Sequence, residues 1–74
     1  MSIKSTNDID KTIGSRILHC RKVAKMSQAE LAEKLGISRQ QVCFYEKASC
    51  RVSGSRLSEI ANIFNKPFNF FFDQ

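Results

Sequence analysis

The chain has 74 residues, of which 42% are hydrophobic and 26% charged, and its formal net charge is +5. This length allows one domain with a modest core but no catalytic cleft between two lobes, and the composition excludes disordered and fibrous classes. The positive charge is concentrated between Lys11 and Arg56, where ten Lys and Arg residues stand against three Glu residues. A basic centre is typical of proteins that bind a polyanion, although a merely solubilising surface carries the same charge.

The three cysteines, Cys20, Cys43 and Cys50, are odd in number and form no C-x-x-C pair. The sequence therefore predicts neither a disulfide framework nor a zinc site. The single histidine, His19, has no partner in a catalytic or ligating arrangement, so we expect no enzymatic activity, no cofactor and no metal. The N-terminal stretch lacks the apolar core of a signal peptide, and no apolar run is long enough to span a bilayer. We expect a cytoplasmic protein without a membrane segment.

The first half of the chain predicts a short arm followed by two helices. Residues 1–9 are polar and aperiodic and predict a flexible arm, which leaves 10–74 as the domain. Asp10 or Thr12 is suited to cap a first helix, whose inner face begins at Ile13 and recurs at helical spacing. Ser27 and Glu30 form a capping box that starts a second helix, which ends at Gly36 in a left-handed turn that glycine adopts without steric cost.

The same start signal returns at once, because Ser38 and Gln41 form a second capping box and begin a third helix. A fourth helix follows Ser53, with an apolar stripe that runs to Phe64, and Asn65 suits a left-handed end. Pro67 can stand only outside a helix or in its first turn, so the remaining residues predict a stop and a short fifth helix. The expected fold is an all-α, compact five-helix bundle.

The second and third helices are joined through Gly36 with almost no connecting chain, so they must cross steeply, with the small Ala32 at the crossing. This is the helix-turn-helix arrangement, whose second helix fits the major groove of B-DNA. At about 100° per residue, Val42 and Tyr45 fall on a core side. The opposite side carries Arg39, Gln40, Cys43, Phe44 and Lys47. These types suit base readout, since Arg pairs with guanine, Gln with adenine, and Phe or Cys contacts a thymine methyl; the alternative is a solvated helix face.

The stretches IGSRILHCRKVAKMSQAELAEKLGISRQQVCFYEKA and LSEIANIFNKPFNFFF resemble the Xre/Cro/C1 family of bacterial and phage helix-turn-helix transcription regulators. The resemblance implies a lambda-repressor-like fold and contacts between DNA bases and Arg39, Gln40 and Phe44, to which the chemistry of the face adds Cys43. It implies that DNA phosphates are contacted by Gln28, Ser38, Lys47, Ser49 and Arg51.

The resemblance also implies an ion pair between Arg21 and Glu46, which we interpret as structural. Two positions depart from the family pattern, because Lys25 and Ala48 stand where the family often has glycine. A left-handed backbone is costly for other residues, which leaves the conformation of both turns open.

A small core without disulfide or metal favours a homodimer. The candidate interface residues follow Pro67 and are Phe68, Phe70, Phe71 and Phe72, of which at least one must close the core. The predicted function is sequence-specific binding of double-stranded DNA by a transcriptional regulator, either a repressor or a dual regulator. It would act as a homodimer on a palindromic operator, with recognition helices about 34 Å apart. We expect no effector domain beyond residue 74, so that regulation would act through promoter occupancy or a contact with an RNA polymerase subunit.

The alternative function is an antitoxin-type or other protein-interaction module of the same fold, in which Phe44 and the aromatic tail bind a toxin. In either case the resemblance implies a bacterial or phage-encoded protein that associates with the nucleoid.

Overall fold

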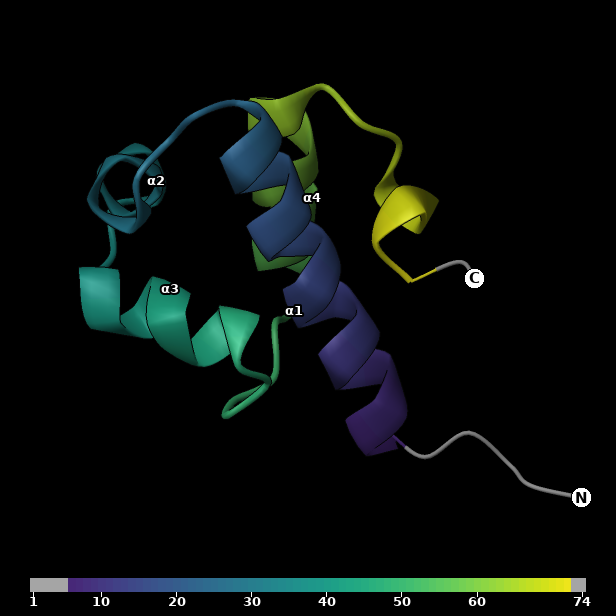
Figure 1. Ribbon diagram of the computed structural model, residues 1–74. Coiled ribbons are helices and arrows are strands. Elements are labelled where there is room, and N and C mark those ends of the chain that lie inside the picture. The colour runs from purple at the N-terminus through teal and green to yellow at the C-terminus, as the bar shows by residue number, and fades with distance from the viewer. Residues whose placement is uncertain (1–5, 73–74) are drawn as a thin grey trace, which may run out of the picture.

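A computed structural model describes residues 6–72 of the chain. These residues form four α-helices and one 3-10 turn: α1 (Thr6–Val23), α2 (Gln28–Leu35), α3 (Arg39–Glu46), α4 (Gly54–Phe64) and η1 (Phe68–Phe71). In Figure 1, α2 and α3 lie on one side of α1, while η1 lies on the other side and α4 packs behind α1. The prediction of an all-helical fold is confirmed for this part of the chain, and none of its helices is long and apolar enough to cross a membrane.

The prediction of a fifth α-helix is wrong, because Phe68–Phe71 form a single 3-10 turn. Pro67 precedes the turn in an extended conformation with φ −65° and ψ 150°, and no side chain caps it. The amides of Phe70 and Phe72 bond to carbonyls three residues earlier, at 3.0 and 3.2 Å. A 3-10 helix is seldom longer than three or four residues. The ring of Phe71 is completely buried, so its packing in the core holds this segment in place.

The first helix begins at Thr6, one turn before the expected cap, so residues 6–9 belong to α1 rather than to a flexible arm. The rest of the expected arm, residues 1–5, lies outside the described residues. Asp8 stands in the first turn, where a negative charge is favourable at the positive end of the helix dipole. Asp10 is held by an ion pair with Arg51 in a distant loop, at 3.6 Å. Both features accompany a helix that begins before the point that periodicity alone indicated.

The helix starts are set by serine side chains. Ser27 and Glu30 form the predicted capping box, and hydrogen bonds from the backbone and then the hydroxyl of Ser27 lower the pKa of Glu30 below its ordinary value. Ser38 caps α3 as predicted, by accepting a bond from the amide of Gln41. The second half of that capping box is absent, because the side chain of Gln41 donates instead to Sγ of Cys50, at 3.1 Å.

Each of the four α-helices ends at a residue with a left-handed backbone, and the four φ angles lie between 54° and 71°: Lys25, Gly36, Ala48 and Asn65. At the end of α3, the amide of Ala48 bonds to the carbonyl of Tyr45 at 3.1 Å, and the next amide bonds to that of Phe44 at 2.9 Å. This pattern is the Schellman motif, which satisfies the last carbonyls of a helix. Lys25 and Ala48 thus take the left-handed conformation without the freedom of glycine.

The variant Ala48→Gly should raise the free energy of unfolding by about 0.5–1 kcal/mol, because it removes the strain of a Cβ atom at φ 58°. The gain is smaller than the strain itself, since glycine also has more entropy to lose on folding. Urea denaturation of the variant and the original protein measures the difference. Lower stability in the variant would contradict this account of the turn.

The core lies where α1, α2, α3 and α4 meet, and η1 closes its open side. It consists of twelve buried residues: Ile13, Ile17, Cys20, Leu31, Ala32, Leu35, Val42, Tyr45, Leu57, Ile60, Ala61 and Phe71. Leu31, Ala32 and Leu35 are the inner face predicted for the second helix, and Ala32 is only 3% exposed. The core therefore holds α3 through Val42 and Tyr45, while Arg39, Gln40 and Phe44 of the same helix stay exposed.

Candidate nucleic-acid interface

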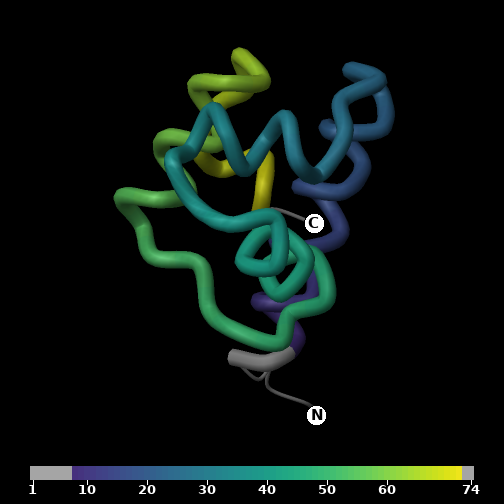
Figure 2. Tube along the Cα trace, turned by 90° about the vertical axis from the view of Figure 1, so that its left-hand side faces the viewer, coloured from purple at the N-terminus to yellow at the C-terminus, as the bar shows by residue number. Residues whose placement is uncertain are grey.

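The outward face of α3 is formed by the residues that its helical spacing predicted. Val42 and Tyr45 are buried against the core. The exposed residues on the other sides are Arg39, Gln40, Phe44 and Lys47, while Cys43 is half-buried. Figure 2 views α3 end-on, in front of the rest of the molecule, with the connection to α4 beside it. The helix therefore offers a protruding surface with guanidinium, amide, ammonium and aromatic groups.

An ion pair fixes the end of α3 to α1. Nε of Arg21 lies 2.6 Å from Oε2 of Glu46, and a second guanidinium nitrogen lies 3.1 Å from Oε1. The side chains are only 13% and 5% exposed. Arg21 also donates to the carbonyl of Met26, at 3.0 Å, and so reaches the turn that leads into α2. The guanidinium therefore connects α1 to the end of α3 and to the turn before α2, as expected of a structural pair.

Gln28, the first residue of α2, lies between the two ends of α3. Its Nε2 atom donates to Oε1 of Glu46 at 2.9 Å, and its Oε1 atom accepts from Nη1 of Arg39 at 3.4 Å. The structure therefore brings together Gln28, Arg39 and Glu46, for which separate roles were predicted. The contact between Gln28 and Arg39 joins the first side chains of α2 and α3.

The connection between α3 and α4, residues 47–53, carries the other residues expected to contact phosphate. Lys47, Ser49 and Arg51 are exposed, and the side chain of Arg51 is 69% exposed although it pairs with Asp10. The bond from Gln41 to Cys50 ties the connection to α3. The roles of Asp10 and Cys50 could not be found from the sequence, because Asp10 meets Arg51 across 41 positions and thiols seldom mark a loop anchor.

The aromatic tail divides into buried and exposed residues. Phe71 is the phenylalanine that closes the core, and it is not available as an interface residue. Phe70 is half-buried, and its ring lies under the cations of Arg16 and Lys66, each 5.1 Å from its centre. Phe68 and Phe72 are 44% and 37% exposed, and their rings meet edge to face at 5.3 Å. Phe68 is the first residue of η1 and Phe72 directly follows its end, and η1 lies across α1 from α3 (Figure 1).

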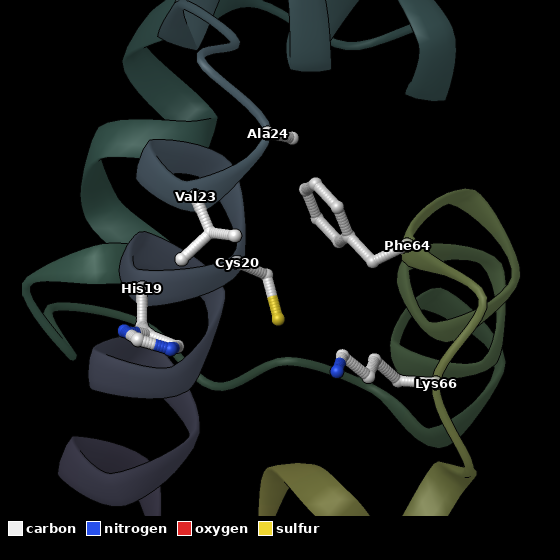
Figure 3. A pocket seen from close by; sticks show the side chains of 6 residues that line it. All are labelled: His19, Cys20, Val23, Ala24, Phe64 and Lys66. Carbon is white, nitrogen blue, oxygen red and sulfur yellow. The ribbon is translucent and has the colours of Figure 1, made fainter.

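A second surface feature is a shallow hollow between the C-terminal ends of α1 and α4. Figure 3 shows its lining residues: His19, Cys20, Val23, Ala24, Phe64 and Lys66. Burial raises the pKa of the Cys20 thiol, which favours an uncharged, unreactive group at the base of the hollow. Within residues 6–72, no three side chains of His, Cys, Asp or Glu are grouped so that they could hold a metal ion. The hollow has no arrangement that indicates catalysis.

Comparison with known proteins places these features in one family. A family model described as Helix-turn-helix matches residues 17–71. The chain is 49% identical over 70 residues to an uncharacterized HTH-type transcriptional regulator of Sinorhizobium medicae (strain WSM419). The matched stretch covers 95% of this chain and 50% of the relative. It is 40% identical over 67 residues to a regulator of the same description from Sinorhizobium fredii (strain NBRC 101917 / NGR234), covering 90% and 47%.

A third relative, described as an uncharacterized transcriptional regulator in the ATPase CF(0) region of Rhodospirillum rubrum, is 33% identical over 69 residues, covering 93% of this chain and 64% of the relative. The chain thus spans about half the length of the first curated relatives it matches. The family model covers most of the chain, including α2, α3 and α4. The chain belongs to the Xre/Cro/C1-type helix-turn-helix family of transcriptional regulators.

Proposed function

We propose that the protein regulates transcription by binding a specific double-stranded DNA sequence, with α3 in the major groove. The observation that carries this proposal is the division of α3 into a buried side and an exposed side with Arg39, Gln40 and Phe44. Arg and Gln can each make paired hydrogen bonds to the edge of one base, and an aromatic ring can contact a thymine methyl. On this exposed side the polar and charged groups of Arg39 and Gln40 stand beside Phe44, which is a combination suited to base edges.

The surroundings of α3 support contacts to the DNA backbone. Gln28 and Ser38 stand at the starts of α2 and α3, and Lys47, Ser49 and Arg51 stand just beyond the end of α3. Phosphate contacts on both sides of a recognition helix fix its position along the groove but carry no sequence information. We assign these five residues to that role.

Selection of binding sites from a pool of random duplexes at near-physiological salt tests the proposal. The expected result is enrichment of a sequence whose two halves form an inverted repeat, about one helical turn apart. A folded protein that enriches no sequence would overturn DNA reading by α3. It would favour instead a protein-interaction module of the antitoxin type.

The assigned roles predict two kinds of loss. Arg39→Ala or Gln40→Ala should weaken binding to the selected site by about 1–3 kcal/mol and leave binding to random DNA almost unchanged. Arg51→Ala should weaken binding to both kinds of duplex alike and reduce the salt dependence, because a phosphate contact is read equally on any sequence. Fluorescence anisotropy titrations at several salt concentrations measure both. Equal losses on the two duplexes for all three variants would contradict the assignment.

We further propose that the protein represses transcription as a homodimer whose interface is formed by Phe68 and Phe72. These two rings are exposed and contact each other at the two ends of η1, and η1 lies across α1 from α3 (Figure 1). Pairing of two copies through them would therefore leave both recognition helices accessible. A twofold dimer would fit two half-sites of a palindrome in successive major grooves. Occupancy of such an operator would block a promoter by position alone.

The variant Phe68→Glu should raise the dissociation constant of the dimer at least about tenfold, because it places a charge in an apolar contact. The matched control is Val23→Glu, a change at an apolar residue that is 69% exposed on α1, outside the proposed interface. Sedimentation equilibrium over a range of concentrations measures both variants beside the original protein. An original protein that stays monomeric, or equal weakening by both changes, would contradict this interface.

A further inference from the structure

We infer that Glu46 is a positioning residue for DNA reading, because it orients the amide of Gln28 so that this amide steadies the guanidinium of Arg39. We name these three residues the Glu46–Gln28–Arg39 relay. The inference rests on the proposed function of α3 and deepens it, since it gives a specificity role to a residue that otherwise has only a structural one.

The relay begins with the positions of its members. Arg39 and Glu46 are the first and last residues of α3, seven positions apart and therefore on nearly the same side of the helix. Their long side chains approach each other from opposite ends, and the amide of Gln28 lies between them, bonded to Glu46 at 2.9 Å and to Arg39 at 3.4 Å. One side chain of α2 thus connects the two ends of α3.

The direction of the amide follows from the chemistry of its neighbours. An ionised carboxylate accepts hydrogen bonds and donates none, so the NH2 end of Gln28 must face Glu46. The carbonyl end must then face the opposite way, toward Arg39. An arginine side chain donates hydrogen bonds and accepts none, so it requires an oxygen at that place. With the amide reversed, donor would face donor at Arg39, and the contact would be lost.

The ion pair with Arg21 leaves Glu46 able to accept a further hydrogen bond. Arg21 donates to Oε2 of Glu46 at 2.6 Å and to Oε1 at 3.1 Å, and a carboxylate oxygen can accept from a second donor as well. Glu46 is 5% exposed at its side chain, so its direction is fixed by packing before DNA binds. The fixed carboxylate therefore sets the amide of Gln28.

The last bond of the relay suits a readout residue. The bond from Arg39 to Gln28 is long and exposed, so it limits the rotamers of the guanidinium while leaving it free to turn toward a base. Restricting a side chain in advance lowers the entropy that it loses on binding. This smaller entropy loss matters only at the base pair that Arg39 contacts. We therefore expect the relay to affect discrimination between bases at that one pair.

The test compares affinities for two operators that differ only at the base pair read by Arg39, identified as the pair at which Arg39→Ala loses discrimination. Glu46→Gln should lower the ratio of the two affinities about fivefold, as expected for coupling between neighbours. Its effect should vanish in the Arg39→Ala background. A fall in stability does not imitate this result, because the folded fraction scales both affinities equally and cancels from the ratio.

Gln28→Met provides a second variant that keeps the Arg21–Glu46 pair and hence the fold. It should lower the same ratio, in addition to a general loss of affinity from its phosphate contact. The matched control, Glu33→Gln, removes an equal charge from an exposed position of α2 and should leave the ratio unchanged.

Three outcomes would overturn the relay, and the first two are distinguishable from failure of the proposed function. If the protein selects an operator but Glu46→Gln and Gln28→Met leave the ratio unchanged, the relay alone is wrong. If both variants reduce discrimination equally at every base pair of the operator, Glu46 acts only on the general placement of α3. A protein that selects no operator would overturn both the relay and the proposed function.

Discussion

Arg21→Met should lower the free energy of unfolding by about 3 kcal/mol or more, because it leaves an almost buried carboxylate without its counter-charge. The remaining partner of Glu46 would be the amide of Gln28, and the carbonyl of Met26 would lose its donor. A domain of this size is held by only about 4–11 kcal/mol, so the variant should lose a large share of its stability. Urea denaturation followed by circular dichroism measures the loss.

Two further variants separate the ion pair from general effects of the substitution. Lys22→Met removes the exposed neighbouring cation of α1 and should change stability by less than about 0.5 kcal/mol. Arg21→Met combined with Glu46→Met should recover part of the loss, because no unpaired charge then remains in the interior. A single variant as stable as Lys22→Met would show that the pair contributes nothing to the fold.

Local signals in the sequence predicted the parts of the fold that depend on neighbouring residues. The starts of α2, α3 and α4 follow from Ser27, Ser38 and Ser53, each of which accepts a bond from an amide three residues later. Gly36 and Asn65 indicated two helix ends by their own conformational preferences. These features require only a few consecutive residues, and the structure has them as predicted.

The errors arose where distant contacts decided the local structure. The pairing of Asp10 with Arg51 accompanies a longer α1. A periodic pattern within one helix cannot reveal a partner that lies in another part of the chain. The burial of Phe71 holds the C-terminal segment in a single 3-10 turn, although Pro67 also suits the first turn of a longer helix. Ala48 and Lys25 show the same effect, since they occupy left-handed positions that their own preferences disfavour.

The candidate interface was predictable to a similar degree. Spacing at helical period separated Val42 and Tyr45 from Arg39, Gln40 and Phe44, because it depends on α3 alone. The bonds that Gln28 makes to both ends of α3 depend on the crossing of two helices and on side-chain rotamers. Sequence spacing therefore identified the reading face, while the contacts that orient its members required the structure.

The place where α1 crosses α3 depends on a residue that the sequence did not single out. A Cβ atom on Gly14 would lie 2.5 Å from the carbonyl oxygen of Tyr45 and 2.7 Å from that of Glu46. Both distances are far below van der Waals contact, and the atoms belong to backbone that cannot rotate away. Only glycine lets α1 approach the end of α3 this closely, and the same approach brings Arg21 to Glu46.

Gly14→Ala should therefore lower the free energy of unfolding by about 2–3 kcal/mol, although alanine in an open helix position is better than glycine by about 1 kcal/mol. Gly54→Ala is the matched control, because a Cβ atom there meets nothing within 4 Å, and it should be neutral or raise stability by about 0.5 kcal/mol. Urea denaturation of both variants measures the contrast. Because the added methyl group also pushes the end of α3 away from Arg21, Gly14→Ala should weaken operator binding even where the protein remains folded. Equal stabilities for the two variants would mean that α1 and α3 can separate without cost, and that Gly14 does not set the position of the reading helix.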